Sequence, residues 1–296
     1  MFLSLLYCFS NLNIDVIAPS SGIDEIEIWK KIEKLVGKKC INKNIKSSLQ
    51  QVFEDASKKF VILDKFLKSN NKILWAIRGG YGIDKIMPFI IKEDYSNSKK
   101  KTIVGYSDLT ALQIYFSQKY GWKNISGCML KDYFDSNKNQ KSKDAIYNYL
   151  SGKTSYLIIF DLKPLNKSSK NTKIIEGKTT GGNMTSIQNG IGTPWQIDTK
   201  NKILFLEDVN VNGYQLDRIL THFKNAGLFK NVKAIIFGNF GNMKQNIKVL
   251  KHFANSIDIP IFQTDSFGHQ RENLPTGINF DGIISKQENN YIIKMN

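Results

Sequence analysis

The first half of this sequence is dominated by short apolar runs that stop at turns and are followed by segments with helical spacing. Three such pairs of run and turn are 14–18 with 19–22, 73–77 with 78–82, and 102–104 with 105–108. Helical spacing of apolar residues follows at about 24–36 and 55–69, and again after residue 108. Repeated strand–helix units with turns at the strand ends predict an α/β domain with a mainly parallel sheet.

The second half resumes this pattern after a polar stretch rich in Lys, Asn and Ser, about 132–173, whose one apolar run is 156–160. We expect strands at 203–206 and 234–237, helices at about 214–226 and 244–255, and a loop-rich final third with short strands. The predicted organisation is an N-terminal domain at 1–150, a linker at 151–175 and a smaller C-terminal α/β domain at 176–296.

The 296 residues carry a formal net charge of +16, and a charge of this size first suggests nucleic acid as a binding partner. Only three of the 42 basic residues are Arg, and the Lys residues are scattered beside Asn or Ser, as on a solvated surface. No nucleic-acid-binding module accompanies the charge, so we expect no nucleic-acid partner.

The cysteines and the N-terminus bear on the compartment. Cys8, Cys40 and Cys128 are far apart and odd in number, which argues against a disulfide framework or a zinc site and favours a reducing compartment. Residues 1–10 are apolar but lack a basic region and are too short to span a bilayer. We expect a retained extension, a cytoplasmic location and no membrane partner.

Ser107 is the candidate nucleophile. It lies in the turn Gly105-Tyr106-Ser107-Asp108, between an apolar run and a helix. A tight strand-to-helix turn raises the hydroxyl above the sheet and points a helix N-terminus at the reaction centre. Leu109 replaces the second glycine of the usual elbow motif. Alone, the motif is equally compatible with a serine that caps a helix.

His269 is the candidate base among three histidines. His222 and His252 fall in predicted helices, whereas His269 follows Phe267-Gly268 in a loop, where catalytic groups commonly lie. Glu207, at the end of an apolar strand, is the candidate acid that orients the imidazole. Asp208 is its neighbour, but adjacent strand residues face opposite sides, so only one of the two should point into the site.

The three arginines, Arg78, Arg218 and Arg271, each lie near one of these candidates. In a chain that otherwise uses Lys, Arg suggests paired recognition of a carboxylate. Arg78 leads into the glycine-rich loop 79–82, whose backbone can approach a ligand closely and which matches no phosphate-binding motif. We expect Arg78 and Arg271 to bind substrate, with Arg78 the better candidate for a terminal carboxylate.

Taken in order, these segments resemble the LD-carboxypeptidase family, which includes muramoyltetrapeptide carboxypeptidases and microcin C immunity peptidases. The matching segments are 18–21, 78–82, 105–112, 181–183, 192–194, 206–208, Tyr214 with 217–218, 267–269 and 274–277. The resemblance implies a serine peptidase whose nucleophile is Ser107, orienting acid Glu207 and base His269, with oxyanion donors on the backbone of Asp108 and Gly80.

The resemblance also implies an N-terminal domain like that of class I amidotransferases, a smaller C-terminal domain, and no metal or organic cofactor. The implied reaction releases a C-terminal D-amino acid, D-alanine, from the L,D-peptide bond of murein tetrapeptide in cell-wall recycling. A homodimer is possible under the same resemblance. The partner is thus a small peptide substrate.

Two departures from the family pattern leave substrate preference open. A second acid often follows the triad glutamate by four residues, where this chain has Val211, and a His-Gly-Pro segment is replaced by Ser126-Gly127-Cys128. One alternative is a microcin-C-type immunity peptidase that cleaves a peptidyl-adenylate analogue and uses Trp195 as an aromatic surface, although Trp commonly belongs to the core. Another is a non-catalytic muropeptide-binding protein.

Overall fold

The computed structural model describes residues 9, 12–23, 25–37, 55–288 and 290–296. The expectations for Cys8, Cys40 and the N-terminal extension fall outside these ranges, apart from the buried Phe9. Within them, no helix combines the length and apolar character needed to cross a bilayer.

The N-terminal half forms a five-stranded sheet in the order β1-β2-β3-β4-β10, in which β1 to β4 are parallel. Its strands are β1 (Ile14–Ile17), β2 (Ile73–Ala76), β3 (Thr102–Val104), β4 (Asn124–Ser126) and β10 (Thr276–Ile278). Its helices are α1 (Ile26–Val36), α3 (Ala56–Leu67), α4 (Ile83–Ile90), η3 (Ser107–Leu109), α5 (Thr110–Tyr120), η4 (Leu130–Phe134) and α6 (Gln140–Leu150). The mixed α/β fold with parallel strands is confirmed.

The C-terminal half closes into a seven-stranded barrel, β11-β12-β5-β9-β8-β7-β6. Its strands are β5 (Leu157–Pro164), β6 (Ile174–Asn183), β7 (Lys202–Glu207), β8 (Ala234–Asn239), β9 (Ile261–Gly268), β11 (Asp281–Gln287) and β12 (Asn290–Met295). Its helices are α7 (Lys167–Lys170), α8 (Met184–Gly190), α9 (Gly213–Asn225) and α10 (Met243–Asn255). Strands β6 to β9 are parallel, whereas β5, β11 and β12 run antiparallel to their neighbours.

Two expectations about this half differ from the structure. The segment 151–175, expected as a linker, contains β5, which hydrogen-bonds to β12 and β9 and so belongs to the barrel. The last third, expected to be loop-rich, contains the eight-residue strand β9. Strand β5 was missed because the run 156–160 has too few alternating residues to indicate a strand. Strand β9 was missed because the polar residues Gln263 and Thr264, which are both buried, interrupt its apolar pattern.

Strand β7 illustrates how the sequence builds two apolar layers. Ile203 and Phe205 pack into the core cluster that continues into the N-terminal half, whereas Leu204 and Leu206 pack against α8, α9 and α10. Alternate residues of a strand face opposite sides, so Glu207 continues the first face and Asp208 the second.

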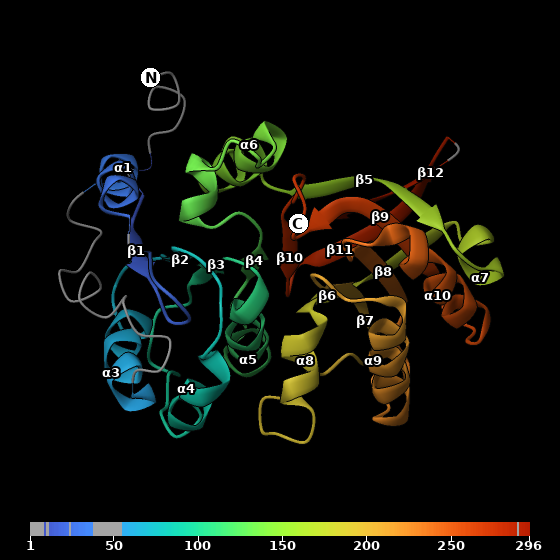
Figure 1. The fold of residues 1–296 in the computed structure, drawn as a ribbon, viewed down its shortest axis with the longest axis horizontal. Helices are drawn as coiled ribbons and strands as arrows, with labels where there is room; N and C mark the ends of the chain where they lie inside the picture. The colour runs from blue at the N-terminus through green and yellow to red at the C-terminus, as the bar shows by residue number, and fades with distance from the viewer. Residues whose placement is uncertain (1–8, 10–11, 24, 38–54, 289) are drawn as a thin grey trace.

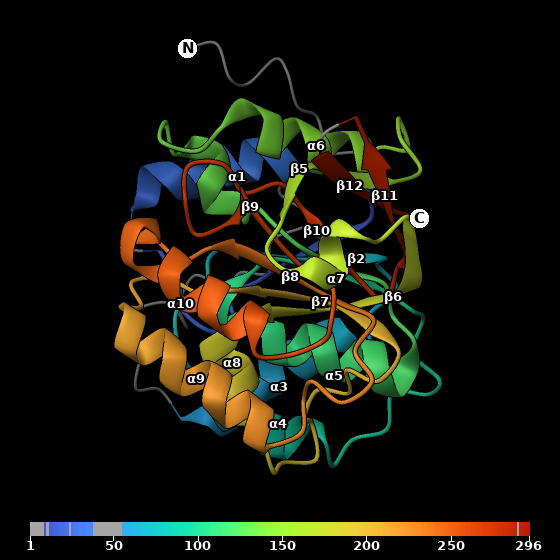
Figure 2. The same cartoon turned by 90° about the vertical axis from the view of Figure 1, so that its right-hand side faces the viewer.

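The two halves are not joined only by the linking chain. Strand β10 follows the barrel strand β9 in sequence, yet it pairs antiparallel with β4 of the first sheet. Figure 1 shows β10 between the two halves, with α5 and α8 side by side below it, and Figure 2 shows α9 and α10 on the outer face of the barrel. The carboxyl ends of β3, β6 and β7 are therefore held in one fixed arrangement.

Candidate active site

Ser107 stands at the carboxyl end of β3 with a left-handed backbone, φ 65°. The preceding Gly105 has φ 155°, and Ser107 begins η3, which leads directly into α5. A left-handed conformation costs a non-glycine residue about 1–2 kcal/mol. Such strain at a turn that carries a hydroxyl is characteristic of a functional position, and it matches the predicted elbow.

The glycine loop after β2 lies directly against this serine. A Cβ on Gly79 would come within 3.1 Å of Ser107 Cβ and 3.4 Å of its Oγ, so only glycine fits without displacement. Gly80 adopts φ 138°, and a Cβ there would lie 2.3 Å from Ser21 Oγ. The loop backbone thus approaches the hydroxyl closely, as an oxyanion hole requires.

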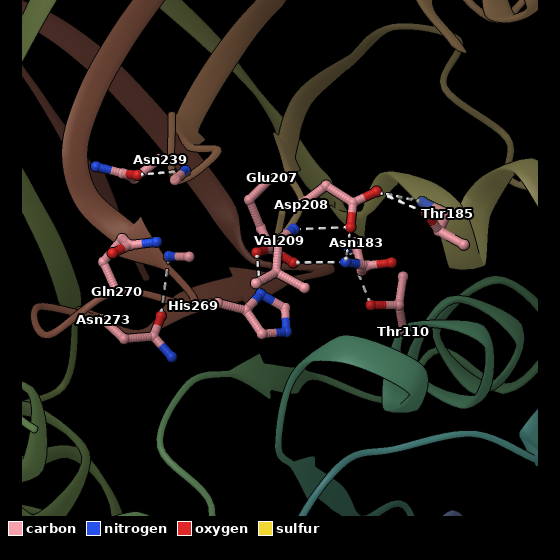
Figure 3. Close-up of polar contacts among 12 residues, drawn as sticks. Thr110, Asn183, Thr185, Glu207, Asp208, Val209, Asn239, His269, Gln270 and Asn273 are labelled. Carbon is pink, nitrogen blue, oxygen red and sulfur yellow. Dashed lines mark hydrogen bonds and ion pairs between the residues drawn. The ribbon is translucent and has the colours of Figure 1, made fainter. Parts of the chain in front are cut away.

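Glu207 and His269 form a hydrogen-bonded pair at the end of the barrel. His269 Nδ1 lies 2.7 Å from Glu207 Oε2, and the Glu207 side chain is 4% exposed. Because a carboxylate only accepts, Nδ1 carries the proton of this bond, which leaves Nε2 free to accept one. Figure 3 shows the imidazole beneath Glu207, turned toward the start of α5.

Asn183, at the end of β6, fixes the carboxylates of both acidic residues. Its Nδ2 donates to Asp208 Oδ1 at 2.9 Å and to Glu207 Oε1 at 3.3 Å, and its backbone N–H donates to Thr110 Oγ1 at 3.1 Å (Figure 3). Asp208 itself accepts from the backbone N–H of Thr185. Only Glu207 reaches His269, and Asp208 caps α8.

Sequence reasoning did not assign a role to Asn183. The available signal was its place after two glycines, since a Cβ on Gly182 would collide with Thr110 and one on Gly181 with Phe205. Such close backbone packing, at the end of a strand, positions the next side chain with precision.

The loop that carries His269 is tied to the N-terminal half. Lys138 Nζ donates to the carbonyl oxygens of His269 and Gln270, at 3.2 and 3.0 Å, and lies 5.4 Å from the Tyr106 ring centroid. Tyr106, next to Ser107, packs edge-on against His269 with ring centroids 4.9 Å apart. These contacts bring the base beside the elbow.

His269 contacts Tyr106, the residue before Ser107, yet among the described residues no hydrogen bond joins Ser107 Oγ to His269. Bonds between nucleophile and base are often long before substrate is bound and tighten during the reaction. A serine hydroxyl beside a histidine that is paired with a carboxylate is the arrangement that acyl transfer by a serine nucleophile uses.

The arginines occupy exposed positions. Arg78 is exposed at the start of the glycine loop. The pKa of Glu25 is lowered mainly by a hydrogen bond from Lys131, and the charge of Arg78 adds a smaller effect in the same direction. Arg271 is exposed two residues after His269, and its carbonyl accepts from Asn139 N–H. Both lie on segments that border the site.

Trp195, expected to contact substrate, packs partly against the protein interior, and its contact with substrate stays a prediction. It is half-buried against the main core, and the carbonyl of Gln196 accepts from Gln118 near the carboxyl end of α5. Gln118 is about three helical turns, roughly 16 Å, beyond Ser107. The chain uses this indole for packing.

Within the part of the chain that the structure describes, no three His, Cys, Asp or Glu side chains gather closely enough to hold a metal ion. Cys128, the one cysteine described, is buried and free, and burial raises the pKa of its thiol to about 12.

Comparison with known proteins identifies the chain. The LD-carboxypeptidase N-terminal domain matches residues 14–127, and the C-terminal domain matches 176–281. A Rickettsia conorii protein named as a carboxypeptidase is 40% identical over 95% of this chain and 90% of its own length. The chain belongs to the LD-carboxypeptidase family. As a member it is a serine-type carboxypeptidase, a hydrolase.

Two further relatives support this membership. The murein tetrapeptide carboxypeptidase of Pseudomonas aeruginosa is 23% identical, over 68% of each chain. The crystal structure of muramoyltetrapeptide carboxypeptidase from Oxalobacter formigenes superposes with a TM-score of 0.79 at 20% identity, covering 95% of this chain and 98% of that one. The structural similarity shows that the two proteins share one fold over almost their full lengths.

The His269 environment predicts a pH dependence. Burial lowers the pKa of His269, but the charge and hydrogen bond of Glu207 outweigh it, so that the pKa is raised above 6.5. A base must be neutral, so kcat/KM should rise with pH through a midpoint above 6.5. The same shift stabilises the fold below 6.5, and this contribution is lost as pH rises through the folded-state pKa. A pH–rate profile with its midpoint below 6.5 would contradict the pairing.

The histidines provide a direct test of the base. His269→Ala should lower kcat by about 10⁴-fold or more, as loss of a triad member does. His222→Ala and His252→Ala are matched controls, because both side chains are exposed on α9 and α10, and they should stay within about tenfold of the parent. Similar losses in all three variants, measured by steady-state kinetics, would exclude His269 as the specific base.

Proposed function

We propose that this protein removes the C-terminal D-alanine from murein tetrapeptide by hydrolysing an L,D-peptide bond, with Ser107, Glu207 and His269 as its triad. The observation that carries the proposal is the buried 2.7 Å pair of His269 and Glu207 beside a serine with a left-handed backbone. The names of relatives that act on murein peptides support the choice of substrate.

The steps follow from the atoms present. His269 Nε2 takes the proton of Ser107 Oγ as that oxygen attacks the carbonyl carbon, and it returns the proton to the leaving amine of D-alanine. Water, deprotonated by the same nitrogen, then cleaves the acyl-serine ester and restores Ser107. Backbone N–H groups of Asp108 and Gly80 stabilise the oxyanion formed in each half-reaction.

The setting of the reaction is part of the same proposal. We infer that the N-terminal domain is of the class I amidotransferase type, that the domains divide near residue 150 with β5 in the C-terminal domain, and that the protein works in the cytoplasm, as a homodimer or alone. The parallel strands β1 to β4 support the first inference, the pairing of β5 within the barrel supports the second, and the absence of a cysteine framework in the sequence supports the cytoplasmic location.

Mass spectrometry tests the proposed reaction. Incubation of the purified protein with murein tetrapeptide should yield tripeptide and free D-alanine, and EDTA should leave the rate unchanged because the mechanism uses no metal. Ser107→Ala is the control and should give no product above background. Intact tetrapeptide, or activity lost to EDTA and restored by zinc, would overturn the proposal.

Two alternatives make different predictions in the same assay. A microcin-C-type peptidase would cleave an aminoacyl sulfamoyl adenosine faster than tetrapeptide and would need an aromatic surface for the purine, for which the half-buried Trp195 is the candidate. A non-catalytic binding protein would retain tetrapeptide in equilibrium dialysis without converting it.

Arg78 is the proposed cation for the terminal carboxylate, because it is exposed at the entrance of the glycine loop that borders Ser107. Arg78→Lys should raise KM for tetrapeptide by about tenfold or more, since a charge-assisted pair contributes about 1.5–3 kcal/mol. Amidated tetrapeptide should be a poor substrate for the parent and should lose little further in the variant.

Arg218→Lys is the matched control for this prediction. Arg218 is exposed on α9 and stacks over Tyr214, so its replacement should leave KM near the parent value. Unchanged selectivity between acid and amide in Arg78→Lys would show that another group holds the carboxylate.

A further inference from the structure

Asp108, directly after the nucleophile, is buried and has a side chain with a specific partner. It is 8% exposed, and its Oδ2 accepts the backbone N–H of Ile83 at 3.1 Å. Ile83 is the first residue of α4, where backbone donors have no partner within the helix. Gly82, the N-cap of that helix, has no side chain to offer. Asp108 therefore caps a helix that belongs to a different strand–helix unit.

The capped helix begins where the glycine loop ends. At the other end of that loop, Gly79 lies against Ser107, close enough that a Cβ would reach within 3.1 Å of the serine Cβ. Gly79 and Ile83 lie on one loop, and Ser107 and Asp108 are consecutive residues. The packing of Gly79 against Ser107 and the hydrogen bond from Ile83 to Asp108 therefore connect the two segments at both ends. The loop cannot move away from Ser107 while both contacts hold.

Polar and charged groups on three segments surround the Asp108 carboxylate. Lys59 of α3, whose Nζ donates to Ser20 O at 2.9 Å, and Ser20 at the end of β1 favour the ionised form, whereas Asp84 of α4 opposes it. Burial is the largest effect, and the pKa of Asp108 is raised to about 6. The carboxylate is thus ionised at neutral pH, where it accepts the Ile83 N–H most strongly.

Keeping this charge in the interior lowers stability. A carboxyl group whose folded-state pKa is raised stabilises the fold fully only below its unfolded-state pKa, and the contribution is lost as pH rises through about 6. A residue that served stability alone would be better neutral. A buried charge on Asp108 has a reason if the ionised carboxylate is needed to hold the end of the glycine loop at Ile83.

We propose that the Asp108 side chain is a positioning residue, which fixes the glycine loop against Ser107 through Ile83 so that the loop N–H groups face the developing oxyanion. The inference rests on the proposed serine mechanism and deepens it. It is separate from the backbone N–H of Asp108, which stays in place when the side chain is changed.

The test measures how fast a small fluorophosphonate labels Ser107, because this reaction needs the oxyanion hole but not the natural substrate. Asp108→Ala should label at least tenfold more slowly than the parent. Asp108→Asn, which keeps a neutral acceptor, should be intermediate, at least threefold slower than the parent. On tetrapeptide, Asp108→Ala should lower kcat with KM within about threefold.

Asp84→Asn is the matched control, because Asp84 also lies on α4 but accepts from Asn189 and not from the loop backbone. It should label within about threefold of the parent. Thermal melts at pH 8 verify folding, and if Asp108→Ala does not fold, Asp108→Asn decides. Labelling of the folded Asp108 variant at the parent rate overturns the inference alone, and a parent that is never labelled overturns the serine mechanism with it.

Discussion

The bond between His269 and Glu207 is the constraint on which the rest of the structure depends. A carboxylate buried this deeply would be costly without partners, and it has two, the imidazole at 2.7 Å and the amide of Asn183 at 3.3 Å. The three residues come from the ends of three barrel strands: Asn183 from β6, Glu207 from β7 and His269 from β9. The closed barrel is what holds three strand ends at the spacing that this pair requires.

The nucleophile comes from the other half of the chain, so its alignment depends on contacts between the halves. Asn183 N–H donates to Thr110 at the start of α5, and Lys138 donates to the carbonyl of His269. Each contact uses a rigid helix terminus or backbone group. His269 is thereby held against the turn that carries Ser107, and under the proposed mechanism this lowers the ordering that substrate binding must accomplish.

The sequence predicted the parallel N-terminal strands and the helices α9 and α10 because their apolar spacing is regular. Strand alternation predicted that only one of Glu207 and Asp208 would face the site, and the family resemblance assigned that role to Glu207, which alone of the two contacts His269. The barrel could not be predicted, because β5 falls in a polar stretch and closure depends on pairings between distant strands. The sequence could not show how far Trp195 is buried, because an indole suits both a packed and an exposed position.

The pairing of β10 with β4 has a consequence for how the chain is made. The first sheet is completed by residues 276–278, which are synthesised only after the barrel strands β5 to β9. Until then β4 presents an open edge, and open edges invite pairing with other chains. A chain truncated before residue 269 would thus lack both His269 and the strand that covers the β4 edge of its first sheet.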